Sequence, residues 1–479
     1  MEGRCRRRIS IIKKETGIKK DSAVERPVIG KLRKCIIIAA WLTIWHILAL
    51  AADNPILLAT PAQTAWRMLA LFGGGSFYAA VGRSLLRIAM GFFAGMAAAL
   101  LLASGSRRFS LIEEFLSPLM ALAKAVPVAS FVVVLLIWWG AEALSAVICF
   151  LVVLPNIYIN ILEGLKSTDS KMLEMARVFR LPARSRFFYI YRPALKPFLY
   201  SGMKISLGMC WKSGIAAEVI GVPGGSIGEG LYLSKVYLDT AGVLGWTAAV
   251  ILLSVFFEKA VLHLVDRFFA WNPGCGGKRY AEQKHAKERM HGAGCPKPPV
   301  QEGAIRLTEV TKAYGGQTVI DRLSVVYEPG QTYYLTGPSG SGKTTLLRIL
   351  ARLTEPDSGQ MTAPSRCGVV FQEDRLCEDY SAVTNVELAT GDRAGAEEAL
   401  GLLLPQEALH KPCRQLSGGM RRRVALVRAM EAESRYVLLD EPFTGMDRDA
   451  CAGAMQYIRE RQAGRTVIIA HHFQNFNKI

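Results

Sequence analysis

Long apolar segments dominate the first 270 residues of the chain and alternate with short polar ones. The apolar runs lie near residues 35–52, 84–104, 111–138, 143–163, 199–222 and 241–266. Several of them reach the length of ~20 residues that a helix needs to cross a bilayer. The pattern predicts an all-α, polytopic membrane domain of about six transmembrane helices over residues 35–269. Pro118 and Pro127 are expected to bend or break the third run.

Three other segments have a different composition. Residues 1–34 form a basic arm that precedes the first apolar run, and it has no small-residue cleavage site, so that run is expected to be an anchor. Residues 270–302 are rich in glycine, proline and charge, which is typical of a flexible linker. A further domain is predicted over residues 303–479, so the chain is a multi-domain protein.

Positive charge is confined to the first part of the chain. There are 58 Lys and Arg against 40 Asp and Glu, a formal net charge of +18. From Gly303 onward basic and acidic residues number 21 each, so the whole excess belongs to residues 1–302. A nucleic-acid-binding protein is expected to keep positive charge on a folded soluble face. The distribution therefore argues against nucleic acid and for a lipid bilayer as a partner.

The basic residues flank the apolar runs on alternate sides. Residues 1–35 hold 12 Lys and Arg and residues 164–198 hold 8, whereas residues 54–79 and 223–240 hold one each. The positive-inside rule then predicts a cytoplasmic N-terminus, and an even number of spans returns the C-terminal domain to the cytoplasm. Arg83 and Arg87, at the outer end of the second run, are expected to snorkel or to mark a misplaced boundary. Glu218 and Lys212 near the fifth run are candidates for the substrate pathway.

A glycine-rich segment of the C-terminal domain fits the Gly-x-x-x-x-Gly-Lys-[Ser/Thr] pattern. It follows a β-rich segment at 332–335 and opens a helix-like run at 346–350, as a phosphate-binding loop requires. In such a loop backbone N–H groups surround the phosphates, the lysine reaches the β- and γ-phosphates, and the Thr344 hydroxyl holds Mg²⁺. The predicted nucleotide-binding residues of the loop are Gly337, Pro338, Ser339, Gly340, Ser341, Gly342, Lys343, Thr344 and Thr345.

Two segments further along make the motif more specific. Residues 416–420 read Leu-Ser-Gly-Gly-Met, and residues 436–442 read Tyr-Val-Leu-Leu-Asp-Glu-Pro, a buried-strand pattern that ends in two carboxylates. With these motifs in this order, the chain resembles the ATP-binding cassette (ABC) family from about residue 303 to its C-terminus. The resemblance implies an α/β phosphate-loop ATPase domain whose cofactors are ATP and Mg²⁺.

The resemblance also implies which residues act on the γ-phosphate. Asp440 is expected to bind Mg²⁺ together with Thr344 and Gln372. Glu441 is expected to polarise the attacking water as general base. Gln372 matches the Q-loop glutamine of the family, which contacts metal and water and faces the membrane domain.

His471 matches the switch histidine of the family and is the third expected catalytic residue, with His472 as the alternative one register step away. The chain stops at Ile479, 8 residues after His471, and we expect this short end to affect the stability of the cassette and the position of the histidine. Met420 replaces the usual Gln of the signature, a change expected to be tolerated. Arg352 takes a position that is commonly Gly.

Other matching positions imply that an ATP site is shared between two cassettes. Ser417, Gly418 and Gly419 are expected to meet the γ-phosphate held by another copy, and Asp447 resembles the D-loop that crosses between paired cassettes. Tyr314 sits where the family stacks an aromatic ring on adenine. The predicted partner is therefore a second copy of the chain or a related half-transporter.

Residues 164–198 contain a second informative pattern. The segment 173–182, Leu-Glu-Met-Ala-Arg-Val-Phe-Arg-Leu-Pro, resembles the cytoplasmic Glu-Ala-Ala coupling loop of binding-protein-dependent importer permeases. A short helix capped by a turn is expected to form a knob that docks in a cassette groove near Gln372. Met175 replaces the first Ala and Arg180 the usual Gly, and the loss of this Gly argues against a left-handed turn there.

The similarity extends over roughly residues 56–268 and is greatest to the nitrate/sulfonate/taurine branch, including Trp-Trp-Gly at 138–140. It implies import of a small solute across the bacterial plasma membrane, delivered by an external solute-binding protein. The alternatives are an ABC exporter and a non-transporting or inactive membrane sensor. The ten cysteines form no Cys-x-x-Cys pair, and Cys275 and Cys295 with the nearby histidines fit no known metal site.

Overall fold

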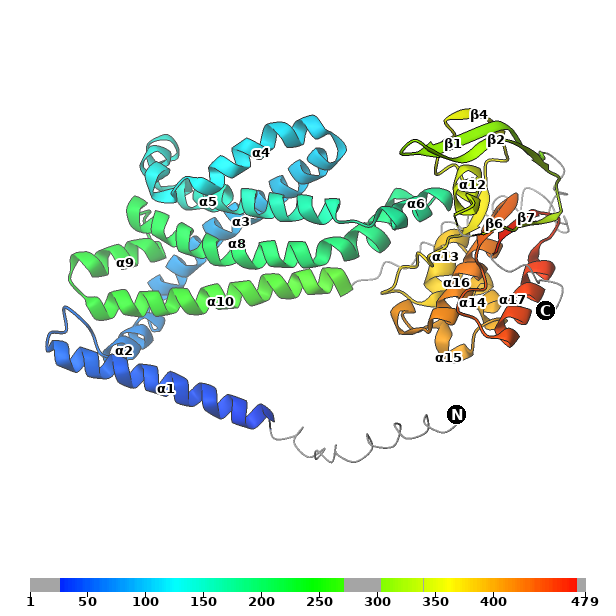
Figure 1. Cartoon of the computed structure of the whole chain (residues 1–479). Coiled ribbons are helices and arrows are strands. Elements are labelled where there is room, and N and C mark those ends of the chain that lie inside the picture. Colours follow the sequence, from blue (N-terminus) through cyan, green and yellow to red (C-terminus); the bar gives the residue numbers. More distant parts are fainter. Residues whose placement is uncertain (1–25, 271–302, 339, 472–479) are drawn as a thin grey trace, which may run out of the picture. The chain divides into compact units, whose positions relative to one another are not determined.

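The computed structural model describes residues 26–270, 303–338 and 340–471 (Figure 1). The chain divides into two compact units. Of the described residues, the first unit contains those up to 102 together with 114–158 and 204–261, and the second contains 103–113, 159–203 and those from 262 onward. The predicted basic arm up to residue 25, the linker from residue 271 to 302, Ser339 and His472 lie outside the described residues.

The first unit is all α, as the apolar pattern predicts, and several of its helices extend into the second unit (Figure 1). The helices are α1 (Arg26–Ala52), α2 (Pro61–Phe72), α3 (Gly75–Arg108), α4 (Ser110–Ala125), α5 (Val128–Lys166), α8 (Arg192–Gly221), α9 (Ile227–Val236) and α10 (Thr240–Ala270). The helices α3 and α5 approach closely at Gly91, where a Cβ would lie 2.2 Å from the carbonyl oxygen of Ala146. Small residues allow such close contacts between apolar helices.

The boundaries of the predicted spans need correction. Residues 111–138 do not form one span, because the chain leaves the helix between α4 and α5 at Pro127, and α4 has only 16 residues. The remainder of this run, from residue 128 onward, and the predicted run 143–163 together form the helix α5. This helix has a non-helical kink at Gly140 (φ 72°). Within the described residues, four helices are long and apolar enough to cross a membrane: 35–52, 75–108, 130–166 and 240–270. The helix α8 has 30 residues, but Lys and Glu side chains lower its hydropathy.

The second unit holds two sheets and a group of helices (Figure 1). An antiparallel sheet has the order β2-β1-β4 and a parallel sheet the order β3-β7-β6-β5. The strands are β1 (Ile305–Tyr314), β2 (Gln317–Tyr327), β3 (Thr332–Leu335), β4 (Ser358–Thr362), β5 (Cys367–Val370), β6 (Tyr436–Asp440) and β7 (Thr466–Ala470). The helices are α6 (Ser170–Val178), α7 (Ala183–Arg186), the π-helical turn η1 (Phe187–Tyr191), α12 (Lys343–Leu350), α13 (Ala382–Thr390), α14 (Arg393–Gly401), α15 (Gln406–Leu409), the 3₁₀ turn η2 (Cys413–Gln415), α16 (Gly418–Glu431) and α17 (Arg448–Arg461).

The centre of the parallel sheet positions the candidate site. The strands β6 and β7 are buried at every residue, which agrees with their continuous apolar sequences. Asp440 pairs with Ala470 in the register of these strands, so His471 follows at the same edge of the sheet. The strand β3 ends at this edge and leads into the glycine-rich loop. Ligands of open parallel sheets bind at the carboxyl ends of the strands.

The turn after α6 contradicts the expectation for Arg180. This residue adopts the left-handed conformation, with φ of 51°, although it is not glycine. Two hydrogen bonds close the helix end, from the N–H of Leu181 to the carbonyl of Ala176 (2.9 Å) and from the N–H of Arg180 to that of Arg177 (3.1 Å). This is a Schellman motif, which satisfies carbonyl groups that the helix end leaves without partners. Arg352 ends α12 in the same way, with φ of 57°.

Candidate functional site

The segment between β3 and α12 folds as the loop that its glycines predict. Gly337, Gly340 and Gly342 have φ of 153°, 84° and 86°, a region that other residues rarely adopt. The ammonium group of Lys343 donates to the carbonyl oxygens of Gly337 (2.7 Å) and Pro338 (2.9 Å). It therefore lies over the loop, next to the N-terminus of α12, where a phosphate group is favoured.

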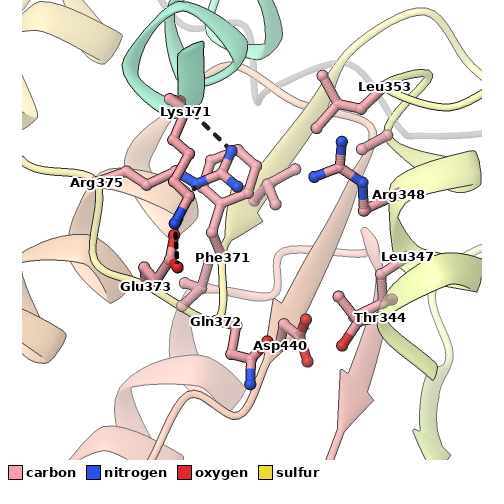
Figure 2. Close-up of a pocket in the computed structure, with 13 residues that line it drawn as sticks. Lys171, Thr344, Leu347, Arg348, Leu353, Phe371, Gln372, Glu373, Arg375 and Asp440 are labelled. Carbon is pink, nitrogen blue, oxygen red and sulfur yellow. Dashed lines mark hydrogen bonds and ion pairs between the residues drawn. The ribbon is translucent and has the colours of Figure 1, made fainter. Parts of the chain in front are cut away.

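The three predicted metal contacts line one pocket. Thr344 lies in the first turn of α12, Gln372 follows β5 and Asp440 ends β6, and Figure 2 shows them together. Asp440 is 5% exposed. Burial raises the pKa of its carboxyl group, although the hydrogen bond from the Thr344 hydroxyl and the positive charge of Lys343 act in the opposite direction. A bound cation would favour the ionised carboxylate.

This donor set fits Mg²⁺. A hydroxyl, an amide and a carboxylate offer oxygen ligands, and Mg²⁺ is commonly held by one or two carboxylates together with phosphate oxygens of the substrate. Across residues 26–270, 303–338 and 340–471, no group of three or more His, Cys, Asp or Glu side chains is arranged to hold a metal ion.

Glu441 is held by its backbone in a conformation that is unusual for a non-glycine residue. Its φ is 49°, and its N–H donates to the carbonyl of Ala470 (3.0 Å). The guanidinium of Arg422 donates to the carbonyl of Glu441 (2.8 Å), to that of Asp440 and to that of Phe371 (2.6 Å). Backbone strain of this kind is concentrated at functional sites, where the surroundings hold it in place. Arg422, from α16, thereby fixes the backbone of Asp440 and Glu441 and also that of Phe371, the residue before Gln372.

Two other predicted residues lie at strand ends. The N–H of His471 donates to the carbonyl of Leu335 (3.2 Å), and its ring centre lies 6.0 Å from that of Phe443. Tyr314 ends β1 with 49% of its surface exposed, and the ammonium group of Lys312 lies 5.5 Å from its ring centre. The exposed ring offers a surface for stacking. Its contact with adenine stays a prediction, as does the catalytic role of His471.

The signature segment begins α16. The Ser417 hydroxyl accepts a hydrogen bond from the N–H of Met420 (3.3 Å) as the N-cap of the helix, and Gly418 is exposed beside it. A Cβ on Gly419 would lie 2.6 Å from the carbonyl oxygen of Gly445, so a larger residue does not fit there. The Met420 side chain packs against the apolar core of the cassette. A Gln side chain would be less favourable there, because burying its amide group costs free energy.

Asp447 begins α17, and its carboxylate accepts a hydrogen bond from the N–H of Ala450 (2.8 Å). It is therefore an N-cap of that helix. Its role in a D-loop between paired cassettes, like the contact of Ser417, Gly418 and Gly419 with another copy, stays a prediction.

Within the second unit, the helix α6 is joined to the phosphate-loop helix by a carboxylate. Glu174 accepts hydrogen bonds from the guanidinium groups of Arg348 (2.7 and 3.1 Å) and Arg375 (2.8 Å). Lys171 forms an ion pair with Glu373 (2.5 Å), next to Gln372 in the chain (Figure 2). The docking of the knob near Gln372 agrees with the prediction, whereas the two arginines that hold it had no assigned role in the sequence.

A buried arginine of α16 completes this arrangement. Arg428 donates to the carbonyl oxygens of Arg375 (2.7 Å) and Asp374 (2.9 Å), and its guanidinium lies 5.1 Å from the ring centre of Phe179. Burial lowers the pKa of Arg428 to about 10. The sequence signal for Arg428 is its position within the apolar run from Val424 to Met430, whereas nothing in the sequence separates Arg422 from Arg421 and Arg423 beside it. The helix α6 and the residue after it thus contact α12, the Gln372 segment and α16.

In the first unit, Glu218 and Arg87 form a buried ion pair. They are 1% and 8% exposed, with Arg87 Nη1 3.5 Å from Glu218 Oε1. The other carboxylate oxygen accepts from the hydroxyl of Ser84 (2.6 Å) and from the N–H of Gly228 (3.2 Å). Arg87 also pairs with Glu142. Of the two expectations for Arg87, the misplaced boundary is confirmed, because α3 begins at Gly75. Snorkelling is not, because the Arg87 side chain is buried beside Glu218.

Two family models match the chain. The model described as ABC transporter matches residues 320–444, and the model described as binding-protein-dependent transport system inner membrane component matches residues 91–269. An aliphatic sulfonates import ATP-binding protein of Paraburkholderia xenovorans is 39% identical over 172 residues, which are 35% of this chain and 67% of that protein. The Nod factor export ATP-binding protein I of Sinorhizobium fredii is 34% identical over 228 residues, 42% of this chain and 66% of that protein.

A solved structure of a dimeric ATP-binding cassette bound to ADP and phosphate is 29% identical, covers 35% of this chain and 88% of that one, and has a TM-score of 0.33. The chain spans between 56% and 67% of the length of the curated relatives that it matches.

The site and the fold together define an ABC protein in which a helical permease domain and an ATPase domain share one polypeptide. The chain belongs to the ABC transporter family, and its relatives include ATP-binding proteins of aliphatic sulfonate importers. The permease domain and its apolar helices make it a membrane protein.

Proposed function

We propose that the chain is one half of an ATP-driven importer, which a second copy of itself or a related half-transporter completes. The observation that supports this most directly is the pairing of Glu174, in the permease-like segment, with Arg348. Arg348 lies four residues after Thr344, one turn along the same helix. A shift of α12 on nucleotide binding would therefore act on α6 through a pair of charged side chains.

In the proposed ATP site, the loop N–H groups and Lys343 bind the phosphates. Mg²⁺, bound by Thr344, Gln372 and Asp440, would neutralise charge on the γ-phosphate. Ser417, Gly418 and Gly419 of the second copy close the site from the other side. Each ATP is then held between two cassettes, and one copy alone makes half of each site.

Hydrolysis needs a group that receives the proton of the attacking water. Glu441 follows Asp440, the proposed Mg²⁺ ligand, by one residue. Its carboxylate takes the proton of the attacking water as general base. His471, at the same edge of the sheet, acts on the γ-phosphate. Release of phosphate separates the cassettes again, and α6 transmits the change to the membrane helices.

The solute is a small anion or zwitterion of the sulfonate, nitrate or taurine type, delivered by an external solute-binding protein. The names of the import relatives support a sulfonate, and the description of the matching permease model supports a binding protein. Nitrate and taurine come from the resemblance of residues 138–140 to that branch of permeases. The location is the bacterial plasma membrane, with the N-terminus and the cassette cytoplasmic, because the basic segments 1–35 and 164–198 then face the cytoplasm.

The ATPase role is tested with the full chain in lipid vesicles. Glu441→Gln keeps the size of the side chain but removes the base, so phosphate release should fall at least about a hundredfold, within the usual contribution of a general base. ATP binding, measured by titration with a fluorescent ATP analogue, should persist. Lys343→Ala should weaken the binding itself. Absence of ATP hydrolysis by the unsubstituted chain would favour a non-transporting sensor.

Export is a second candidate, because Nod factor export proteins are among the relatives. Vesicles with outward-facing cassettes, loaded with labelled taurine and the candidate solute-binding protein, distinguish the two directions. An importer should remove taurine from the lumen when ATP is added outside. In a second batch the labelled taurine is supplied outside instead, and its ATP-dependent accumulation in the lumen would support export.

A further inference from the structure

Arg192, the first residue of α8, lies buried among groups from three segments of the second unit. It is 4% exposed. Its Nη2 donates to the hydroxyl oxygen of Tyr380 (3.2 Å), and its Nη1 donates to the carbonyl oxygen of Phe268 in α10 (3.3 Å). The guanidinium also lies 5.3 Å from the ring centre of Phe188. A buried guanidinium is costly unless its donors are matched, so these contacts are a built arrangement.

Tyr380 makes the cassette side of the contact. Its hydroxyl donates to the carbonyl oxygen of Phe188 (3.1 Å) while it accepts from Arg192, and its ring centre lies 4.7 Å from that of Tyr189. One phenol group thus joins the cassette to the turn before α8 and to the first residue of α8. Burial raises the pKa of Tyr380, so the hydroxyl stays protonated and able to donate.

The loop that carries Tyr380 is held in one conformation by Asn385, and it continues the chain segment that begins at Gln372. Asn385, 1% exposed at the start of α13, accepts from the N–H of Cys377 (2.7 Å) and donates to the carbonyl oxygens of Cys377 (3.0 Å) and Ser381 (3.0 Å). The segment begins eight residues before Tyr380 at Gln372, which lines the pocket with Asp440. A displacement of Gln372 is therefore passed along a fixed loop to the Tyr380 hydroxyl.

We propose that Tyr380 and Arg192 form a second coupling contact, separate from α6, through which the Gln372 segment positions the cytoplasmic ends of α8 and α10. The contact deepens the proposed function and rests on it. Glu174 and its two arginines bind the knob, whereas Arg192 binds the carbonyl of Phe268, two residues before the end of α10. The nucleotide state of the cassette then reaches α10 without passing through α6. Both residues are positioning residues, because neither lines the nucleotide pocket.

The test compares hydrogen exchange of the full chain in vesicles with and without ATP and Mg²⁺, in a Glu441→Gln background that holds ATP. Tyr380→Phe keeps the ring beside Tyr189 and removes only the hydroxyl. The ATP-dependent change in exchange at residues 262–270 should fall by at least half, while the change at α6 persists. In Arg192→Lys, the single ammonium group replaces the planar guanidinium and cannot reach both the Phe268 carbonyl and the Tyr380 hydroxyl. This variant should also lose the exchange change at residues 262–270 and keep that at α6.

The matched control is Tyr457→Phe, which removes another hydroxyl hydrogen bond inside the cassette, from Tyr457 to Glu431 (2.6 Å). This variant should leave the ATP-dependent changes in exchange at residues 262–270 and at α6 unaltered. An unaltered change at residues 262–270 in Tyr380→Phe, or equal losses at α6 and α10, would overturn the proposal. Failure of the parent Glu441→Gln chain to bind ATP would contradict the proposed function instead, and titration with the ATP analogue measures that separately.

Discussion

Glu174 accepts hydrogen bonds from both terminal nitrogens of Arg348, at 3.1 and 2.7 Å, although 174 residues separate them in the chain. The pair joins α6 to the helix that begins with Lys343 and Thr344. Such a two-point contact between a carboxylate and a guanidinium fixes direction as well as distance. It therefore resists rotation of α6 relative to α12, which a single contact would permit.

Glu174→Gln should uncouple the two helices without unfolding either. The variant keeps the size of the side chain and loses the charge that two arginines bind, and each charge-assisted hydrogen bond contributes about 1.5–3 kcal/mol. Taurine moved per ATP hydrolysed should fall at least about tenfold in the vesicle assay, on the basis of this range. Glu373→Gln is the control, because its ion pair with Lys171 is half exposed and contributes little. Similar losses of taurine transport per ATP in Glu174→Gln and Glu373→Gln would contradict the role of Glu174 as the contact that couples α6 to α12.

The stabilisation that Glu174 gives through Arg348 and Arg375 should be lost as the pH falls. Burial pushes the pKa of Glu174 upward, but hydrogen bonds from Arg348 and Arg375 outweigh it and hold the pKa below the usual range. The stabilisation is therefore fully present above the unfolded pKa of about 4.3 and is lost as pH falls through the lower folded value. Exchange protection of α6, corrected for the intrinsic rate, should be constant from neutral pH to about 4.3 and then decline. In Glu174→Gln the decline should be absent.

Arg180 should tolerate replacement by glycine but not by valine. Gly relieves a left-handed conformation that costs a non-glycine residue about 1–2 kcal/mol. It also loses the hydrogen bond from the exposed guanidinium to the carbonyl of Ser365 (2.6 Å), so the two effects largely cancel. Valine is β-branched and fits this region poorly. Exchange of the Leu181 amide, which closes the Schellman motif, should rise in Arg180→Val and stay within a few-fold in Arg180→Gly. Equal rates in the two variants would argue against strain at this position.

Sequence reasoning locates motifs whose residues are close together in the chain. The phosphate loop, the Asp440–Glu441 pair and the signature each lie within a few consecutive residues, so the local pattern and its resemblance to the ABC family identify them, while their roles in catalysis stay predictions. The pairing of Glu174 with Arg348, and of Arg192 with Tyr380, joins residues far apart in the chain, and no local pattern encodes it. The boundaries of the apolar runs between residues 111 and 163 were misplaced for a similar reason, since a proline that breaks a helix and a glycine that only kinks one look alike in an apolar run. Arg180 was misjudged because backbone hydrogen bonds at a helix end can outweigh the preference for glycine.

Arg422→Ala should destabilise the cassette strongly. The guanidinium is buried and donates to the backbone carbonyl groups of Phe371, Asp440 and Glu441, and the variant would lose all three of these hydrogen bonds. A loss of about 3 kcal/mol corresponds to about 6–12 °C in the unfolding temperature of a domain of this size. Arg459→Ala, at an exposed position of α17, should shift it by less than about 2 °C. Differential scanning calorimetry of the full chain in detergent measures both.

The ion pair of Glu218 and Arg87 gives the permease domain its own test. Both Glu218→Gln and Glu142→Gln remove one carboxylate partner of Arg87, but Glu218 is buried whereas the Glu142 side chain is 70% exposed. Removing one member of a buried pair commonly costs about 3–5 kcal/mol, because the remaining charge stays in the interior. Glu218→Gln should therefore lower the unfolding temperature of the permease and abolish transport, while ATP binding by the cassette is unchanged. Glu142→Gln should have a small effect on both. If the two variants behave alike, the hydrogen bonds from Ser84 and Gly228 do not distinguish the carboxylates, and Glu218 does not hold α3, α8 and α9 together.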